Sequence, residues 1–433
     1  MSGGHAPGPR GSLLLGSLRE ITGDPLRFYP ATRDEFGDVV RYRLGPFEGH
    51  GLFHPDFVHH VLIRNPEQYE RSRGHHALAS LLGEGLVTTH GEKWRSQRKL
   101  LQPAFSPAAL EPLEARFQEI AARHVARWRQ DSAEGKVFEA ENRFLELGID
   151  HAGQLLFGLD LGADRAALSE TRRLLQVCLS QVDSRVMDPR TPPAWLPTAR
   201  NREFAAARRA IRAAIPSCEG MLAPAWQAIG KLPLTSARER LLDGLVLTFL
   251  AAASETTALG LSWLVDLLAR HPDEQERVRE EARAHAEFEK LRLTQMAFQE
   301  ALRLYPPVWA FSRTAGRDDE IGGFPIRKGT EVLIVPWAIH RDPRFWPEPE
   351  RFRPSRFDMT DPANKRPSTA WIPFSAGPRH CIGFKFALIE GALTAAALLR
   401  EFRITPVHER APRPDPLFTL RPRGGVRLHL SPV

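Results

Sequence analysis

The sequence predicts a mainly α-helical protein with small antiparallel β-sheets, an α+β arrangement. From about residue 107 to residue 303 the chain is rich in Ala, Leu, Arg and Glu, with apolar residues at helical spacing. Short strand-like runs bounded by glycine lie before and after this helical part. We therefore expect a single domain over residues 1–433, in which residues 1–20 form a flexible N-terminal segment.

The expected strands lie near the two ends of the chain. Apolar runs predict strands over 39–44 and 50–53 and a further strand over 331–335. The pairs Gly322-Gly323 and Gly424-Gly425 punctuate hairpin-like segments. No glycine-rich dinucleotide fingerprint follows a predicted strand, so we expect no fused flavin or nicotinamide domain.

Composition narrows the class of protein. Of 433 residues, 42% are hydrophobic, which suits a large core but not a protein with several membrane spans. Three scattered cysteines are too few for a disulfide framework, which favours a reducing cytoplasm. The charge of +7 arises from 59 basic and 52 acidic side chains, so the surface is mixed. We expect a cytoplasmic monomer with no membrane span and no nucleic-acid partner.

Residues 374–383, Phe-Ser-Ala-Gly-Pro-Arg-His-Cys-Ile-Gly, form the most informative segment. The thiolate of cysteine is the form that binds metals, and a turn leading into a helix stabilises this anion. A helix is predicted directly after Cys381, and Gly377 allows a tight loop before it. A free cysteine is more often a buried structural residue. Here the complete spacing Phe-x-x-Gly-x-Arg-x-Cys-x-Gly favours a metal ligand.

This segment resembles the haem-binding loop of the cytochrome P-450 monooxygenases. The resemblance implies a single-domain cytochrome P-450 fold of the soluble bacterial type, with haem b bound through the thiolate of Cys381 as axial iron ligand. It also implies that Phe374 packs beside the sulfur, that Arg379 reaches a haem propionate and that Gly383 completes the loop. Thiolate ligation increases electron density at the iron and favours cleavage of the O–O bond.

A long apolar helix is predicted over 241–270. Asp243, Glu255 and Asp266 leave uncharged stretches that are too short for a membrane span, so we expect a central core helix. Polar groups in such a helix cost free energy unless they are paired.

The polar interruption of this helix, residues 252–257, allows two interpretations. Ser254 and Thr256 could bond back to carbonyls one turn earlier while Glu255 pairs with an arginine, an arrangement common in long helices. The segment also resembles the oxygen-activating motif of the same family, Ala-Gly-x-(Asp/Glu)-Thr-(Thr/Ser). That resemblance implies that Thr256 hydrogen-bonds dioxygen and that Glu255 relays protons. Ala253 stands where the family usually has glycine.

Other segments match family positions that hold the fold and the cofactor. Glu300 and Arg303 lie at i and i+3 on a predicted helix, and Arg351 lies in a proline-broken meander. The resemblance implies that these three form a buried ion network behind the haem. It also implies that the haem propionates are bound by further side chains outside the cysteine loop: Trp94, Arg98 and Arg313.

The resemblance implies a reaction that inserts one oxygen atom from dioxygen into a substrate, with electrons from an acidic ferredoxin or flavodoxin and its reductase. The basic residues expected to attract this partner are Arg95, Lys99 and Lys385. Positions matching the substrate wall are Phe249, Ala252, Val308, Phe311 and Phe418. Their apolar character indicates a hydrophobic ligand such as a terpene, fatty acid, steroid or polyketide.

Three other functions compete with this interpretation. His340 and Asp342 in His-x-Asp could bind non-haem iron, with His408 as a third ligand, but that class needs a β-rich barrel. A haem carrier or sensor would need the cysteine loop without the acid–threonine pair. A related haem-thiolate isomerase or dehydratase that takes no external electrons remains an alternative.

Overall fold

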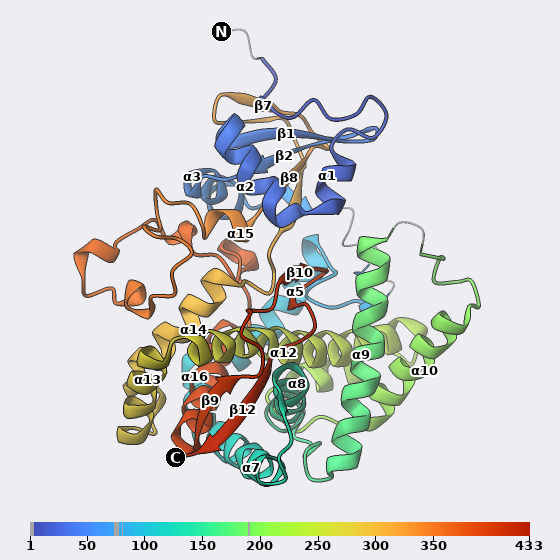
Figure 1. Ribbon diagram of the computed structural model, residues 1–433. Helices are drawn as coiled ribbons and strands as arrows, with labels where there is room; N and C mark the ends of the chain where they lie inside the picture. The colour runs from blue at the N-terminus through green and yellow to red at the C-terminus, as the bar shows by residue number, and fades with distance from the viewer. Residues whose placement is uncertain (1–3, 73–77, 80, 189–190) are drawn as a thin grey trace. The chain divides into compact units, whose positions relative to one another are not determined.

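The computed structural model describes residues 4–72, 78–79, 81–188 and 191–433 (Figure 1). The chain divides into two compact units. The first, here the sheet unit, comprises Met1–Arg73 and Leu302–Cys381; the second, the helical unit, comprises Gly74–Ala301 and Ile382–Val433. The boundary falls within helix α14 (Arg292–Leu304). The predicted class, mainly α with small antiparallel sheets, is confirmed, whereas the single domain over 1–433 stays a prediction.

The sheet unit contains a five-stranded sheet of order β1-β2-β8-β5-β3 and the separate hairpin β6-β7. The β2–β8 pair is parallel and the other pairs are antiparallel. Its strands are β1 (Val39–Leu44), β2 (Phe47–Leu52), β3 (Tyr69–Arg71), β5 (Phe311–Ala315), β6 (Asp319–Ile321), β7 (Phe324–Ile326) and β8 (Glu331–Ile334). Its helices are α1 (Leu18–Gly23), α2 (Pro25–Phe36), α3 (Pro55–His59), the π-helix η1 (His60–Arg64), α15 (Pro336–Ile339) and the 3₁₀ turns η6 (Pro354–Phe357), η7 (Pro362–Asn364), η8 (Ser368–Ala370) and η9 (Gly377–Arg379).

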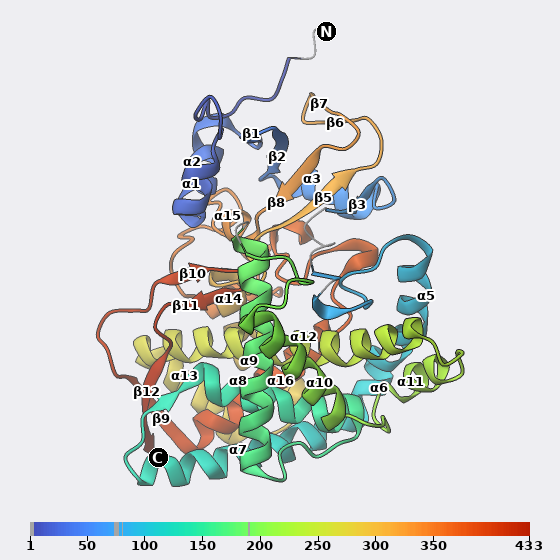
Figure 2. The same ribbon diagram turned by 90° about the vertical axis from the view of Figure 1, so that its right-hand side faces the viewer.

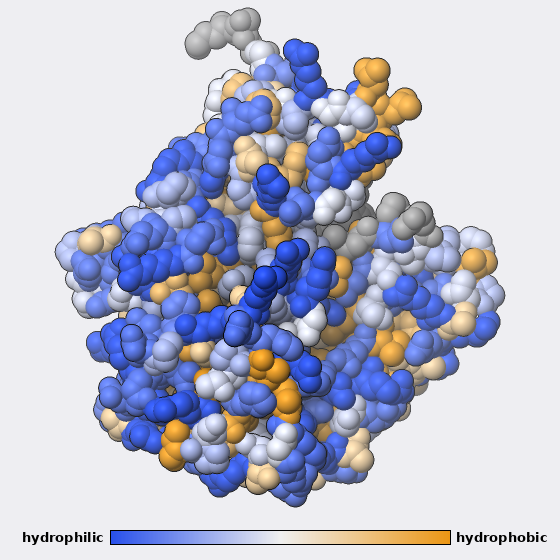
Figure 3. All heavy atoms as spheres, in the orientation of Figure 1, coloured by the Kyte–Doolittle hydropathy of each residue, from blue (hydrophilic) through white to orange (hydrophobic). Residues whose placement is uncertain are grey.

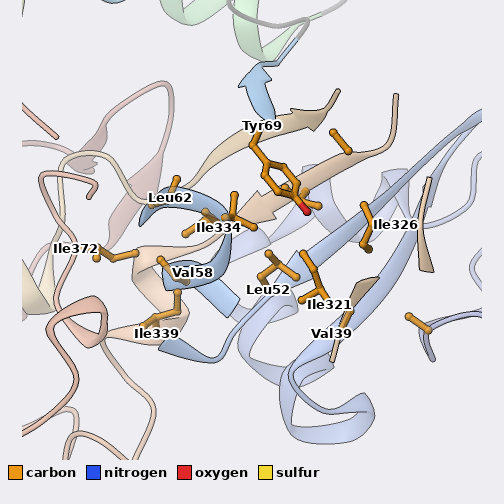
Figure 4. Close-up of a cluster of buried hydrophobic side chains, with 14 residues drawn as sticks. Val39, Leu52, Val58, Leu62, Tyr69, Ile321, Ile326, Ile334, Ile339 and Ile372 are labelled. Carbon is orange, nitrogen blue, oxygen red and sulfur yellow. The ribbon is translucent and has the colours of Figure 1, made fainter. Parts of the chain in front are cut away.

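A hydrophobic cluster joins the sheet of this unit to η1 and to the segment before the cysteine loop (Figure 4). Leu62 of η1 and Ile372 both belong to it, and Ala376 packs against it. Fully burying an aliphatic side chain contributes roughly 1.5–3 kcal/mol. The cluster therefore anchors the start of the segment that leads to Cys381.

The N-terminal segment is attached to the sheet unit. Ser12 and Gly16 form a β-bridge, and Gly16 forms another with Leu44 of β1. The guanidinium of Arg43 donates to the carbonyl of Leu13 at 2.6 Å. The sequence predicts a flexible segment over residues 1–20, whereas these contacts attach part of that segment to β1. The sequence alone does not reveal these partners. Residues 1–3 lie outside the described part of the chain.

The helical unit holds most of the helices and two small antiparallel sheets, β4-β12-β9 and β10-β11. Its long helices are α5 (Gly91–Leu101), α7 (Glu114–Ala133), α8 (Ala140–His151), α9 (Arg165–Met187), α10 (Ala199–Ala214), α11 (Ala223–Gly230), α12 (Ser236–Arg270), α13 (Pro272–Ala284) and α16 (Phe384–Glu401). Shorter turns are η2 (Gln102–Phe105), α6 (Pro107–Leu110), η3 (Glu111–Leu113), η4 (Ala152–Phe157) and η5 (Phe288–Lys290). Its strands are β4 (Phe138–Glu139), β9 (Phe402–Pro406), β10 (Pro414–Pro416), β11 (Leu420–Pro422) and β12 (Arg427–Pro432).

Helix α12 is the core helix of this unit and crosses α8 (Figure 2). It begins after Thr235, whose hydroxyl accepts from the backbone N–H of Arg238, and it ends just before Pro272. By length and composition it could cross a membrane, but 83% of its most apolar stretch is buried. Such burial is typical of a core helix, as the sequence predicts.

The displayed face in Figure 3 is mostly hydrophilic, with apolar side chains in smaller groups. Opposite charges lie close together on the surface. Arg344 pairs with Asp38 at 2.6 Å, and Arg173 pairs with Glu170 at 2.7 Å. This arrangement agrees with the mixed surface expected from the composition.

Candidate active site

The cysteine loop is closed by its own backbone. The N–H of Cys381 donates to the carbonyl of Phe374 at 3.0 Å, and the N–H of His380 donates to the carbonyl of Gly377 at 2.9 Å. The Cys381 side chain is exposed. Helix α16 begins three residues later with Gly383 as its N-cap. The first N–H groups of a helix favour an anion in the preceding turn, so the loop suits a cysteine thiolate.

Gly377 is required by the path of this loop. Its φ is +70°, and a Cβ at this position would lie 1.8 Å from the carbonyl oxygen of Leu62. Leu62 itself is fixed in the hydrophobic cluster of the sheet unit. Any side chain at residue 377 would therefore push the cysteine loop away from the core.

Replacing Gly377 with alanine is expected to lower both the stability and the haem content of the purified protein. A non-glycine residue at positive φ costs roughly 1–2 kcal/mol, and the contact with Leu62 adds a backbone displacement. Gly323→Ala is the matched control, since Gly323 has a φ of +84° and open space around a Cβ. Denaturant unfolding and haem absorbance per protein measure the two effects. Equal haem content in both variants would contradict this role of Gly377.

Aromatic rings hold the start of the loop. Phe374 contacts Trp371 edge-on, with ring centroids 6.0 Å apart, and lies 6.5 Å from the ring of His380. Ser375 has a φ of +60°, which is uncommon for a residue with a side chain. Strain of this kind costs about 1–3 kcal/mol and is concentrated at functional sites.

Three arginines gather in the sheet unit. Strand pairing places Arg71 opposite Arg313, and both lie close enough to Arg379 to repel it. Burial, followed by repulsion from Arg313 and Arg379, lowers the pKa of Arg71 well below its usual value. Burial and Arg379 lower the pKa of Arg313 to about 10. The sequence predicted Arg313 and Arg379 as anion-binding residues but missed Arg71.

This arginine cluster fits the propionates of haem. Buried like charges raise the free energy of the folded protein unless an anion compensates them. A group with two carboxylates supplies that compensation, and guanidinium binds carboxylate with two parallel hydrogen bonds. The residues present therefore suit the cofactor that the cysteine loop implies.

Trp94 and Arg98, the other predicted propionate donors, lie on α5 in the helical unit. Both side chains are partly buried. Arg98 donates from Nε to Oε1 of Gln102, the first residue after α5, at 2.5 Å. Their role at the cofactor stays a prediction.

The polar interruption of α12 has an open face. Between residues 244 and 269, all of which the structure describes, only Ala252, Ala253 and Thr256 are not buried. These residues share one side of the helix. The hydroxyl of Thr256 donates to the carbonyl of Ala252 at 2.8 Å. The back-bonding interpretation predicts that bond, but it does not explain why exposure is confined to this face.

The opposite side of the same turn is closely packed. A Cβ on Gly148 of α8 would lie 2.8 Å from the Cα of Ser254, so the two helices touch there through their backbones. Ser254 is fully buried, and its hydroxyl has no hydrogen-bond partner among the described residues, so the back-bond expected for Ser254 is not formed. Close packing on one side and exposure on the other orient Thr256 toward the open face.

Glu255 lies in a buried polar network. Its Oε1 accepts from Arg421 Nη2 at 2.5 Å and from Thr419 Oγ1 at 2.9 Å. Burial raises the pKa of the Glu255 carboxyl, while Arg421 and Thr419 oppose that rise. Sequence reasoning anticipated an arginine partner but not which one. Arg421 is far from Glu255 along the chain, so no local sequence pattern connects the two residues.

The predicted ion network needs one correction. Glu300 and Arg303 are fully buried, as expected. The Arg351 side chain is 63% exposed and pairs with Glu348 at 3.2 Å, so it does not belong to a buried network. Arg356 is buried instead, and it donates to the Glu348 carbonyl at 2.6 Å and to the Arg351 carbonyl at 3.4 Å.

Arg356, and not Arg351, is the buried arginine of this segment because the chain turns between them. Arg303 also donates to the carbonyl of Arg351, so the backbone of residue 351 faces inward while its side chain faces solvent. Both arginines precede phenylalanine in this meander. The repeated motif was visible in the sequence, but it did not decide between them.

His340 has a structural role. It is fully buried, its Nε2 accepts from the N–H of Ile372 at 2.9 Å, and its Nδ1 donates to the carbonyl of Arg303 at 3.2 Å. Both ring nitrogens are therefore used. Asp342 pairs with Arg344, and no group of three or more potential metal ligands occurs among the described residues. The non-haem iron alternative is wrong.

The predicted substrate-wall residues divide between the two units. In the helical unit, Phe249 stacks on Phe105 with ring centroids 5.7 Å apart, whereas Ala252 is exposed and Phe418 is partly buried. In the sheet unit, Val308 is 37% exposed and Phe311 lies beneath the Arg313 guanidinium. Phe249 is thus largely a core residue, and the others stay predictions.

Comparisons with known proteins identify the family to which this chain is similar. A family model described as Cytochrome P450 matches residues 6–218 and 233–428. Cyclooctat-9-en-7-ol 5-monooxygenase of Streptomyces melanosporofaciens is 32% identical over 423 residues, covering 93% of this chain and 90% of that protein. Cyclooctatin synthase of the same organism is 30% identical, with 96% and 93% covered. Cytochrome P450 4V2 of Mus musculus is 29% identical, with 91% and 82% covered.

Proposed function

This chain belongs to the cytochrome P450 family, and from that membership we propose that it inserts one oxygen atom of dioxygen into a hydrophobic small molecule with electrons from a separate redox partner. It is a monooxygenase whose cofactor is haem. The observation that supports the proposal most directly is the open face of α12, where Thr256 is accessible on a helix that is otherwise buried around it.

The residues proposed to hold the cofactor come from the cysteine loop, the arginine cluster and α5. Cys381 provides the thiolate for the iron, while Arg71, Arg313 and Arg379 bind propionate oxygens. Trp94 and Arg98 act as further propionate donors. When bound, haem supplies the activation of dioxygen that amino-acid side chains cannot provide.

Thr256 is proposed to order a water molecule at the site, and Glu255 is proposed to supply protons. The oxygen atom that is not inserted leaves as water, which requires two electrons and two protons. Thr256 Oγ1 donates its own hydrogen to Ala252, so its lone pairs remain available to accept from an ordered water. Glu255, one residue earlier, can hold a proton because burial raises the pKa of its carboxyl.

Replacing Thr256 with valine is expected to divert electrons to hydrogen peroxide while leaving the carbon monoxide spectrum unchanged. Valine keeps the shape of threonine but removes the hydroxyl that orders water. Ser262→Ala is the matched control, since Ser262 bonds back to Ala258 at 2.7 Å in a fully buried part of the same helix. Peroxide per NADPH, measured with a ligand selected for its spin-state shift, gives the readout. Full coupling in Thr256→Val would contradict this role.

The proposed substrate is a cyclic, mostly hydrocarbon molecule. The two Streptomyces relatives are named for a monooxygenase acting on cyclooctat-9-en-7-ol and for cyclooctatin synthesis. Among the four classes suggested by the apolar wall, steroids and many terpenes are cyclic and mostly hydrocarbon, whereas fatty acids are open chains and polyketides carry many oxygen atoms. A role in secondary metabolism is consistent with these relatives.

The proposed electron donor is an acidic ferredoxin or flavodoxin with its reductase. Lys385 lies at the start of α16, and Arg95 and Lys99 lie on α5, so basic groups accompany two of the predicted cofactor segments. Electrostatic steering of an acidic partner weakens as salt is added. The rate of reduction by ferredoxin should therefore fall with ionic strength, and a salt-independent rate would contradict this partner.

The proposed location is the cytoplasm, with the protein acting as a monomer. Three scattered cysteines are too few for a disulfide framework, which agrees with a reducing compartment.

A further inference from the structure

Glu255 is not held by its own helix. Its two partners, Thr419 and Arg421, belong to the short C-terminal segment around β11. The Glu255 side chain is 9% exposed and that of Arg421 is 31% exposed. The predicted proton-relay acid is therefore tied to a hairpin more than 160 residues away in sequence.

The same hairpin also binds α9. Arg421 Nη2 lies 3.2 Å from Asp183 Oδ2, and the backbone N–H of Phe418 donates to Asp183 Oδ1 at 3.2 Å. One guanidinium is thus shared between two carboxylates, Glu255 and Asp183. Phe418 is also a predicted substrate-wall residue. Its backbone N–H therefore links the predicted substrate wall to Asp183, which shares Arg421 with Glu255.

We propose that Arg421 is the positioning residue for Glu255, and that Asp183 competes for the same guanidinium. This inference rests on the proposed function, because it assigns a control to the proton supply of that site. Residues 418–421 then connect the substrate wall to the acid: a ligand that shifts Phe418 also shifts the segment that holds Glu255.

Because Glu255 and Asp183 share Arg421, substitutions of Arg421 and of Asp183 should move the pKa of Glu255 in opposite directions. Arg421 favours the ionised form of Glu255, so Arg421→Gln should raise the pKa of the Glu255 carboxyl further. Asp183 repels that ionised form and draws on Arg421, so Asp183→Asn should lower this pKa. Loss of one hydrogen bond to a charged group moves the pKa of that group by about 1–2 pH units.

Other charges face this network, and the experiment must separate them. Glu141 on α8 acts on Arg421, while Arg200 on α10 and Asp415 on β10 act on Asp183. Arg423 lies on the same hairpin and pairs with Asp415 at 3.0 Å. Arg423→Gln therefore removes a guanidinium from this hairpin without touching Glu255, and it serves as the matched control.

The first readout is the pH dependence of unfolding of the haem-loaded protein, which requires no substrate. An acid with a raised native pKa makes the folded protein bind more protons than the unfolded chain, so stability falls as pH rises from the unfolded value through the native one. In Arg421→Gln this fall should extend to higher pH than in the parent protein, and in Asp183→Asn it should end at lower pH. Arg423→Gln should leave the pH range of this fall unchanged. Adding Glu255→Gln to the Arg421→Gln variant should abolish the fall.

The second readout is the pH profile of peroxide released per NADPH, with a plant-type ferredoxin and its reductase as electron source. The same opposite displacements are expected, and Arg421→Lys, which keeps the charge, should restore part of the parent profile. Displacements in the same direction, or none, in Arg421→Gln and Asp183→Asn would overturn the proposal. Arg421→Lys and Asp183→Asn keep the test decisive if Arg421→Gln does not fold.

The two proposals fail in different ways. If the parent protein lacks the thiolate carbon monoxide spectrum, the proposed function fails, although the unfolding profiles still report on Glu255. If the spectrum is present and the profiles do not separate, only the positioning role of Arg421 fails.

Discussion

Replacing Cys381 with alanine is expected to abolish the thiolate signature of the haem in the reduced carbon monoxide difference spectrum and to reduce turnover to background. Alanine has no ligand atom, and an exposed thiol in a tight loop before a helix is the group that the fold offers to the iron. The electron density that thiolate supplies is what favours cleavage of the O–O bond. The folded state should persist, because the loop is closed by backbone hydrogen bonds that alanine keeps.

The other two cysteines provide matched controls for that experiment. Burial raises the pKa of Cys178 to about 12 and that of Cys218 to about 11, so both thiols are neutral near pH 7. Cys178→Ala and Cys218→Ala should lose some packing but keep the spectrum. A thiolate spectrum that persists in Cys381→Ala would contradict the assignment, because another residue would then have to bind the iron.

Replacing Arg356 with methionine is expected to destabilise the protein by about 2–6 kcal/mol. Its guanidinium donates to the carbonyls of Pro347 and Glu348 inside the meander, and methionine cannot. Each buried polar group left without its bond costs about 1–3 kcal/mol. Denaturant unfolding of the haem-loaded protein measures the loss, and haem content after purification shows whether the meander still supports the site.

Arg351→Met tests the same chemistry a few residues away. Its exposed pair with Glu348 contributes less than about 1 kcal/mol, so this variant should resemble the parent protein. If Arg351→Met proves as damaging as Arg356→Met, the sequence-based assignment of Arg351 to the buried network would be restored.

Local patterns were enough to single out the two segments on which the proposed chemistry rests. The cysteine loop and the interruption of α12 are each contained in about ten consecutive residues, so their spacing is visible without a fold. The mainly α class follows from the long helical periodicity of the middle of the chain. The structure adds the reason for Gly377, whose partner Leu62 is remote in sequence.

The sequence could not show which remote side chains complete these elements. Arg71 joins Arg313 only through pairing of β3 with β5, and Arg421 reaches Glu255 only through the position of the C-terminal hairpin. The choice between Arg351 and Arg356 depends on which side of the meander faces the interior. In each case tertiary packing selects one arginine from several that are locally equivalent.

The reduced carbon monoxide difference spectrum of the unmodified protein tests the central claim most directly. Ligation of haem by Cys381 predicts a Soret band at the red-shifted position of a thiolate complex. A band at the position of an imidazole-ligated haem would contradict this ligation.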